Sequence, residues 1–393
     1  MTGEWKSSVT KHWPWAALAG AALGFILRVT LVPTHDPDTG TFHLCLLCGE
    51  LGLADFIGNV LLFMPLAGAL YRVGLPGRKT IAALFVLSLS IEIAQLFVPG
   101  RESALGDVVA NTVGAAAGVG LAYWLPRRPR SARSGWAAAV ALVAAMVGIG
   151  LAFRPSFPRT FYYGQWTPDL GQYETYQGKV VNAELGGMVL HSWRVDDSRA
   201  VRRHLLDGDS LRVTAVAGPP PGATSPIFNV YDDHQREIVL LGADGNDLVT
   251  HVRLRATDLL LRQPDLRWRD ALLGLVRGDT LRLGWRRAAP GYCLMLAGRE
   301  RCGLAYTLGD AWGFVQFEPR LPGAAHASLD VWFMALLGLC AGLFLKRDVA
   351  GYAAAGVVLL AAVALPPLLG LAATPLVQLV ALAVGLFGGD LIP

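Results

Sequence analysis

Apolar segments of spanning length recur along the chain. Five fall in its first part, at 13–32, 55–71, 80–98, 107–125 and 136–153. Three more follow a long polar block, at 329–345, 351–365 and 374–387. Because about 20 apolar residues cross a bilayer as a helix, the pattern predicts about eight transmembrane helices. The last two segments are short and Pro366-Pro367 separates them, so a re-entrant pair is the alternative there.

The polar block, residues 154–327, has a different pattern. Apolar and polar residues alternate along 210–216, 248–254 and 280–285, which is typical of half-buried strands. Turn residues separate these stretches, as in 218–222. The block is long enough for one packed domain. Many short strands with such turns predict an antiparallel all-β sandwich.

Composition agrees with a polytopic membrane protein. The chain is 53% hydrophobic and 16% charged, with a mean hydropathy of +0.42, whereas soluble domains carry about 25% charged residues. The net charge of +4 says little by itself. The short loops that carry Lys and Arg all fall on one side if the spans alternate: Lys6, Lys11, Arg72, Arg78, Lys79, Arg127, Arg128, Arg130, Arg133, Lys346 and Arg347. The positive-inside rule then predicts a cytoplasmic N-terminus and an extracytoplasmic block 154–327.

A polar pattern occurs twice inside the apolar segments. Asp55 and Asn59 begin one segment, and Asp107 and Asn111 begin another, each pair four residues apart and therefore on one helix face. Glu92 and Gln95 lie in the segment between them, near its outer end. Ionisable and amide side chains are costly in hydrocarbon unless they have partners. These six groups therefore predict a shared polar site that faces outward.

Each of these residues also has a simpler interpretation. The two aspartates could be N-caps at interfacial helix ends, and the two asparagines could be interhelical hydrogen-bonding groups. Glu92 is harder to explain in this way, because a carboxylate at that depth requires a partner. Arg101, in the outer loop, could pair with Glu92 or Asp107, or hold an anionic headgroup.

The ordered set resembles the VanZ-like family over roughly residues 15–125. The matching residues are Asp55, Asn59, Phe63, Pro65, Gly68, Glu92, Gln95, Arg101, Asp107, Asn111, Gly114 and Gly118. The resemblance implies a small helical membrane module of a bacterial inner membrane. The family's name-giving member is associated with low-level resistance to teicoplanin, a lipoglycopeptide. We expect this module at 13–125 with four spans, a fifth span at 136–153, the sandwich at 154–327, and two or three spans at 328–393.

The outer block resembles the concanavalin A-like (laminin-G-like) jelly rolls, on the stretches 226–232, 237–242 and 246–255. The resemblance implies that glycan or peptide binds there. Candidate calcium or sugar ligands are Asp232, Asp233, Asp244 and Asn246, and ordinary turn roles are the alternative.

The cysteines suggest disulfides rather than a metal centre. Cys293 and Cys302 flank the turn at Gly298, where an outside location permits a cross-hairpin disulfide. Cys45 and Cys48 form a C-x-x-C, and a local disulfide or two lipid-facing thiols is the favoured interpretation. The alternative is zinc or redox chemistry, with His35, Asp36, Asp38 and His43 nearby. We expect no metal, no cofactor and no nucleic-acid partner.

Three functions remain open. The first is binding of a lipid-linked or lipidated envelope molecule in the outward polar pocket, with Asp55, Asn59, Glu92, Gln95, Arg101, Asp107 and Asn111 as ligand-binding residues. The second is an enzyme acting on a lipid-linked envelope substrate, with Glu92 as the catalytic acid or base. The third is a proton-linked transporter using Glu92. Binding or protection is favoured because the carboxylates lack an obvious nucleophile or metal partner set.

Overall fold

The structure, a computed structural model, describes residues 3–33, 42–170, 173–316 and 321–389. It divides into two compact units. The first contains residues up to Arg130 together with Leu259–Arg262, and the second contains Ser131–Asp258 and Gln263–Ile392.

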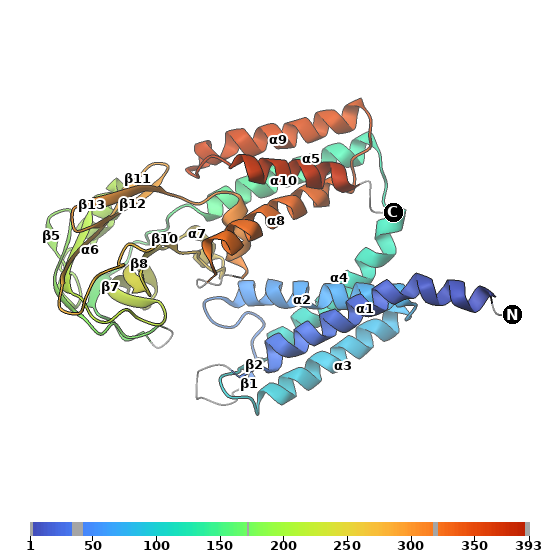
Figure 1. Ribbon diagram of the computed structural model, residues 1–393, viewed down its shortest axis with the longest axis horizontal. Helices are drawn as coiled ribbons and strands as arrows, with labels where there is room; N and C mark the ends of the chain where they lie inside the picture. Colours follow the sequence, from blue (N-terminus) through green and yellow to red (C-terminus); the bar gives the residue numbers. More distant parts are fainter. Residues whose placement is uncertain (1–2, 34–41, 171–172, 317–320, 390–393) are drawn as a thin grey trace. The chain divides into compact units, whose positions relative to one another are not determined.

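Four helices make up most of the first unit (Figure 1). Buried apolar side chains such as Ile26, Phe63 and Leu84 form its core. Two short parallel strands join the loops at one end: Phe42 pairs with Ser103 and His43 with Ala104. The elements are α1 (Gly3–Leu31), β1 (Phe42–His43), α2 (Gly52–Val73), α3 (Gly77–Gln95), β2 (Ser103–Ala104), α4 (Leu105–Trp124) and the 3-10 turn η1 (Leu125–Arg127).

Glycines allow α2 and α4 to pack at close range. A Cβ on Gly114 would lie 2.4 Å from the carbonyl oxygen of Val60, and one on Gly118 would lie 2.2 Å from that of Met64. Small residues of this kind let the backbones of membrane helices approach one another. The close approach brings the polar first turns of the two helices together.

All eight predicted apolar segments form helices. Six of the described helices are long and apolar enough to cross a membrane: α1, α2, α4, α5 (Ala132–Ala152), α8 (Gly323–Gly342) and α9 (Val349–Leu369). The other two are α3, of 19 residues, and α10 (Leu376–Gly388), of 13. The chain is thus a multi-span α-helical membrane protein. The sequence suggested that Pro366 and Pro367 separate the last two helices. In the structure both prolines lie inside α9.

The β-rich part of the second unit contains two antiparallel sheets, as predicted for a β-sandwich. Alternation places Leu211, Val213 and Ala215 in the core. The five-stranded sheet has the order β10-β9-β8-β7-β3 and the six-stranded sheet the order β13-β12-β11-β6-β4-β5. Their bounds are β3 (Tyr162–Trp166), β4 (Lys179–Leu185), β5 (Met188–Val189), β6 (Leu211–Val216), β7 (Ser225–Asp232), β8 (Glu237–Asp244), β9 (Asp247–Val252), β10 (Leu266–Trp268), β11 (Thr280–Ala288), β12 (Gly291–Leu296) and β13 (Arg299–Leu304).

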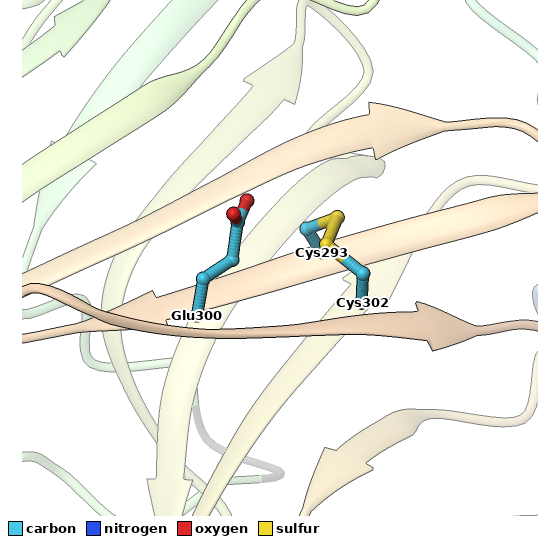
Figure 2. Close-up of side chains that lie close together, drawn as sticks. All are labelled: Cys293, Glu300 and Cys302. Carbon is cyan, nitrogen blue, oxygen red and sulfur yellow. A yellow bond between two sulfur atoms is a disulfide. The ribbon is translucent and has the colours of Figure 1, made fainter.

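Three short helices interrupt this strand pattern: α6 (Ser198–Asp207), α7 (Arg255–Asp258) and the 3-10 helix η2 (Gly309–Phe314). Cys293 on β12 and Cys302 on β13 form a disulfide, with Glu300 beside it (Figure 2). The two sulfurs are bonded to each other, so they do not form a metal site with Glu300.

Candidate functional site

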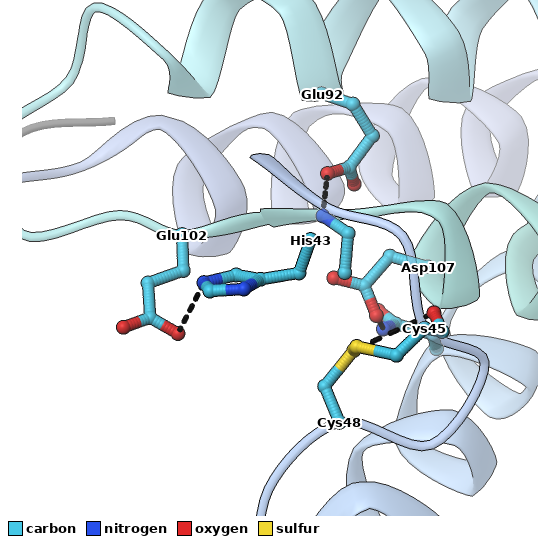
Figure 3. The surroundings of a disulfide bond; sticks show 8 residues. His43, Cys45, Cys48, Glu92, Glu102 and Asp107 are labelled. Atoms are coloured by element: carbon cyan, nitrogen blue, oxygen red, sulfur yellow. Dashed lines mark hydrogen bonds and ion pairs between the residues drawn. A yellow bond between two sulfur atoms is a disulfide. The ribbon is translucent and has the colours of Figure 1, made fainter. Parts of the chain in front are cut away.

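Glu92 is the most deeply buried carboxylate of the first unit's polar cluster. It is 3% exposed, and its Oε2 accepts a hydrogen bond of 3.0 Å from the backbone N–H of Ala104 (Figure 3). The hydroxyl of Ser103 donates to the Glu92 carbonyl at 2.6 Å. Strand β2 is therefore folded back onto the end of α3. Because α3 ends at Gln95 and not at residue 98, Glu92 lies about 4.5 Å from the C-terminal end of the helix at 1.5 Å per residue, which is nearer that end than the sequence suggested.

Two further carboxylates belong to the cluster: Asp107 lies near Glu92, and Asp55 lies near Asp107. Asp107 accepts a 2.7 Å hydrogen bond from the Nδ2 of Asn59, so the two copies of the Asp-x3-Asn pattern bind each other. Asp107 is within electrostatic range of both Glu92 and Asp55. The Oδ1 of Asp55 accepts from Arg262 at 2.8 Å. Like charges at short range repel one another, so this cluster favours a bound cation, a proton or a hydrogen-bond donor.

The amides add acceptors without partners. Asn111 donates to the Ser88 hydroxyl at 2.9 Å, and Gln95 donates to the Thr30 carbonyl at 3.1 Å. The oxygens Asn111 Oδ1 and Gln95 Oε1 are buried and have no partner among the described residues. Most buried polar groups in folded proteins are hydrogen-bonded, so each of these two oxygens could accept a hydrogen bond from a ligand.

The interpretation of Asp55 and Asp107 as N-caps is wrong. The N-caps of α2 and α4 are Leu51 and Ala104, so Asp55 and Asp107 lie inside the first turns and cap neither helix. A carboxylate there still interacts favourably with the helix dipole.

The structure excludes the predicted pairing of Arg101 with Glu92 or Asp107, and binding of an anionic headgroup stays a prediction. Its guanidinium donates to the carbonyls of Val32 at 3.0 Å and Val29 at 2.7 Å. It therefore closes the C-terminal end of α1, where helical carbonyls lack partners, and does not pair with Glu92 or Asp107.

A disulfide loop covers the start of α4. Cys45 and Cys48 are bonded to each other, and the Gly106 N–H donates to the Cys45 carbonyl at 2.9 Å. Figure 3 shows this loop beside Asp107, with His43 3.8 Å from Glu102. Neither sulfur is a thiolate available to zinc. The three other residues named with this motif, His35, Asp36 and Asp38, lie outside the described residues.

The acidic turn residues of the sheets are mostly held by the protein itself. Arg267 binds Asp244 at 2.7 Å, and Arg236 binds Asp232 at 2.7 Å. Asp233 accepts from Thr160 and His234. The carbonyl of Asn246 accepts from Leu272. These contacts favour the structural interpretation of the turn residues.

The sequence reasoning overlooked several polar residues. Ser88, Ser103 and Arg262 contact the first unit's cluster, and each resembles an ordinary helix or loop residue in the sequence. In the second unit, Asp310, His326 and Asp330 lie close together, and Trp312 donates to Asp330 at 2.8 Å. The only sequence signal for that group is the i, i+4 spacing of His326 and Asp330.

Comparison with known families identifies the first helical segment. Residues 11–126 match the VanZ/LLP1 family model. This range contains most of α1, all of α2 to α4 and every residue of the polar cluster except Arg262. The comparisons with curated proteins and with solved structures gave no match.

Proposed function

We propose that the VanZ-like module of this protein binds a lipid-linked or lipidated molecule of the bacterial cell envelope in its polar cluster. The protein would lie in the inner membrane, with its N-terminus in the cytoplasm and residues 154–327 outside. Binding of a lipoglycopeptide such as teicoplanin, or of the envelope molecule that it targets, would give resistance.

The observation that carries this proposal is the concentration of acceptors around Glu92. Asp107 lies within electrostatic range of both Glu92 and Asp55, and the amide oxygens of Gln95 and Asn111 have no described partner. The cationic group expected to complement them, Arg101, is bound to the end of α1. A ligand portion rich in N–H, O–H or amine groups, such as a glycan or peptide, complements this cluster better than a phosphate does.

In the second unit, the six-stranded sheet carries a separate groove, for which we expect a glycan ligand. A groove of about 330 Å³ is lined by residues that include Arg212, Arg282 and Arg299. Among the described residues, neither the Arg212 guanidinium nor the Arg282 guanidinium has a hydrogen bond or ion pair. An anionic portion of a glycan would complement these guanidinium groups. This groove is the place where we expect the β-sandwich to contact its ligand.

Binding is tested with the full chain in nanodiscs of phosphatidylcholine. Fluorescent teicoplanin and a purified lipid-linked peptidoglycan precursor serve as probes. We expect Glu92→Gln to weaken binding of at least one probe about tenfold, as for loss of a charged hydrogen bond. Glu102→Gln, which changes an exposed acid in the loop after α3, is the matched control and should change little.

The same assay separates the alternatives. Conversion of the precursor by the wild type and its loss in Glu92→Gln would favour an enzyme with Glu92 as acid or base. Equal binding by the wild type and Glu92→Gln would mean that the polar cluster does not bind these probes.

A further inference from the structure

The second unit contains a cavity of about 400 Å³ between the ends of spanning helices and the sheet region. Phe153 at the end of α5 and Leu368 and Leu369 at the end of α9 form one side. The turn between β11 and β12, with Pro290 and Tyr292, forms another. The ends of α5 and α9 place this cavity where hydrocarbon gives way to the polar headgroup region.

Three arginines line the cavity: Arg154, Arg255 and Arg287. They come from segments far apart in the sequence, and the backbone N–H of Arg255 donates to the Arg154 carbonyl at 2.8 Å. All three side chains are exposed, and among the described residues none of the guanidinium groups has a hydrogen bond or ion pair. The lining contains no aspartate or glutamate. Three unpaired cations around one cavity repel each other unless an anion joins them.

The apolar side of the cavity continues onto the membrane-facing helices. Leu368 is 76% exposed, and α5 and α9 are both apolar enough to span a bilayer. A ligand with an anionic head and an apolar tail fits this combination of surfaces. A soluble anion would use the arginines alone.

Packing around the cavity fixes its shape in advance. The rings of Phe153 and Tyr306 stack with centroids 4.7 Å apart. The Tyr306 hydroxyl donates to the Pro264 carbonyl at 2.8 Å, and the Ala372 N–H donates to the Tyr306 carbonyl at 2.9 Å. A preformed site requires little ordering when the ligand binds.

We propose that this cavity binds the phosphate group of a lipid, with Arg154, Arg255 and Arg287 as its ligands. Arginine presents planar, bidentate donors that match phosphate oxygens. The inference deepens the proposed function, because it names the phosphate of a lipid-linked molecule as the group bound here. It concerns a separate set of residues, so it can fail while the proposal for Glu92 holds.

The test uses the purified full chain in a neutral detergent and four probes. Dioctanoyl phosphatidylglycerol and farnesyl diphosphate carry phosphate and a tail, dioctanoyl phosphatidylcholine has a neutral headgroup, and inorganic phosphate has no tail. Arg255→Gln and Arg287→Gln should each weaken the anionic lipids about tenfold. Arg277→Gln, which changes an exposed arginine outside the cavity, should leave their affinity within about twofold.

The probes also distinguish the source of the phosphate. Tighter binding of farnesyl diphosphate than of phosphatidylglycerol supports a polyprenyl lipid, and the reverse supports a phospholipid. The proposal is overturned if phosphatidylcholine binds as tightly as phosphatidylglycerol. It is also overturned if inorganic phosphate binds as tightly as the lipids, or if the arginine variants bind like the wild type.

Discussion

Two glycines on α4 that differ by two positions have opposite surroundings. A Cβ on Gly118 would lie 2.2 Å from the Met64 carbonyl oxygen, whereas one on Gly120 would meet nothing within 4 Å. We therefore expect Gly118→Ala to destabilise the protein by about 1–3 kcal/mol through overpacking. Gly120→Ala should be neutral or slightly stabilising, because alanine favours helix. Thermal unfolding in detergent measures both, and equal effects would contradict the close packing of α2 and α4.

The helix face on which a residue lies was predictable from the helical period. Asn59 and Asp107 were expected in one shared polar site, and they form a hydrogen bond. The role of Arg101 was not predictable, because its partners Val29 and Val32 lie about seventy positions earlier and offer only backbone carbonyls. The contact of Arg262 with the cluster was not predicted for a similar reason, since its partner Asp55 is 207 positions away.

At the scale of elements, strands β8 and β9 bring a buried histidine against a carboxylate. His251 Nδ1 lies 3.0 Å from Glu237 Oε1, and the Tyr173 hydroxyl is 3.3 Å from the same nitrogen. Burial by itself lowers the pKa of His251, but Glu237, with Asp265, outweighs burial and Arg267, so that the pKa is raised. Burial and then Glu237 raise the pKa of Tyr173.

The raised pKa of His251 makes stability depend on pH. The contribution is fully present below the ordinary histidine pKa of about 6.5 and is lost as pH rises through the folded value. We expect the Tm of the wild type to fall between pH 6 and pH 8.5, and Glu237→Gln to reduce that fall. Glu300→Gln, which removes the exposed partner of Arg286, should leave the slope unchanged. A wild-type slope retained in Glu237→Gln would refute this linkage.

Element types were more predictable than element ends. The apolar segments and the alternating stretches 210–216 and 280–285 correspond to helices and to β6 and β11. Helices α2 and α4 begin two or three residues earlier than their aspartates suggest. Neither N-cap residue, Leu51 or Ala104, makes a side-chain cap hydrogen bond, so the sequence carries no capping signal at these helix starts. The helix α6 was missed because its many arginines resemble an exposed strand.

At the scale of the whole molecule, the positions of Lys and Arg predict the orientation. In a Cys340→Ser background, which removes the free thiol, we expect Arg277→Cys to react with an impermeant maleimide in intact cells. Arg133→Cys, at the start of α5, should react only after permeabilisation. The opposite labelling pattern would reverse the proposed topology and place the Glu92 cluster on the cytoplasmic side.

The central claim is that the polar cluster around Glu92 is the functional site of the VanZ-like module. The most direct measurement is the teicoplanin susceptibility of a sensitive bacterium expressing the wild type, Glu92→Gln or Glu102→Gln at equal membrane levels. We expect the wild type and Glu102→Gln to protect the cells from teicoplanin. We expect Glu92→Gln to give no protection. Protection that persists in Glu92→Gln, or none from the wild type, would contradict it.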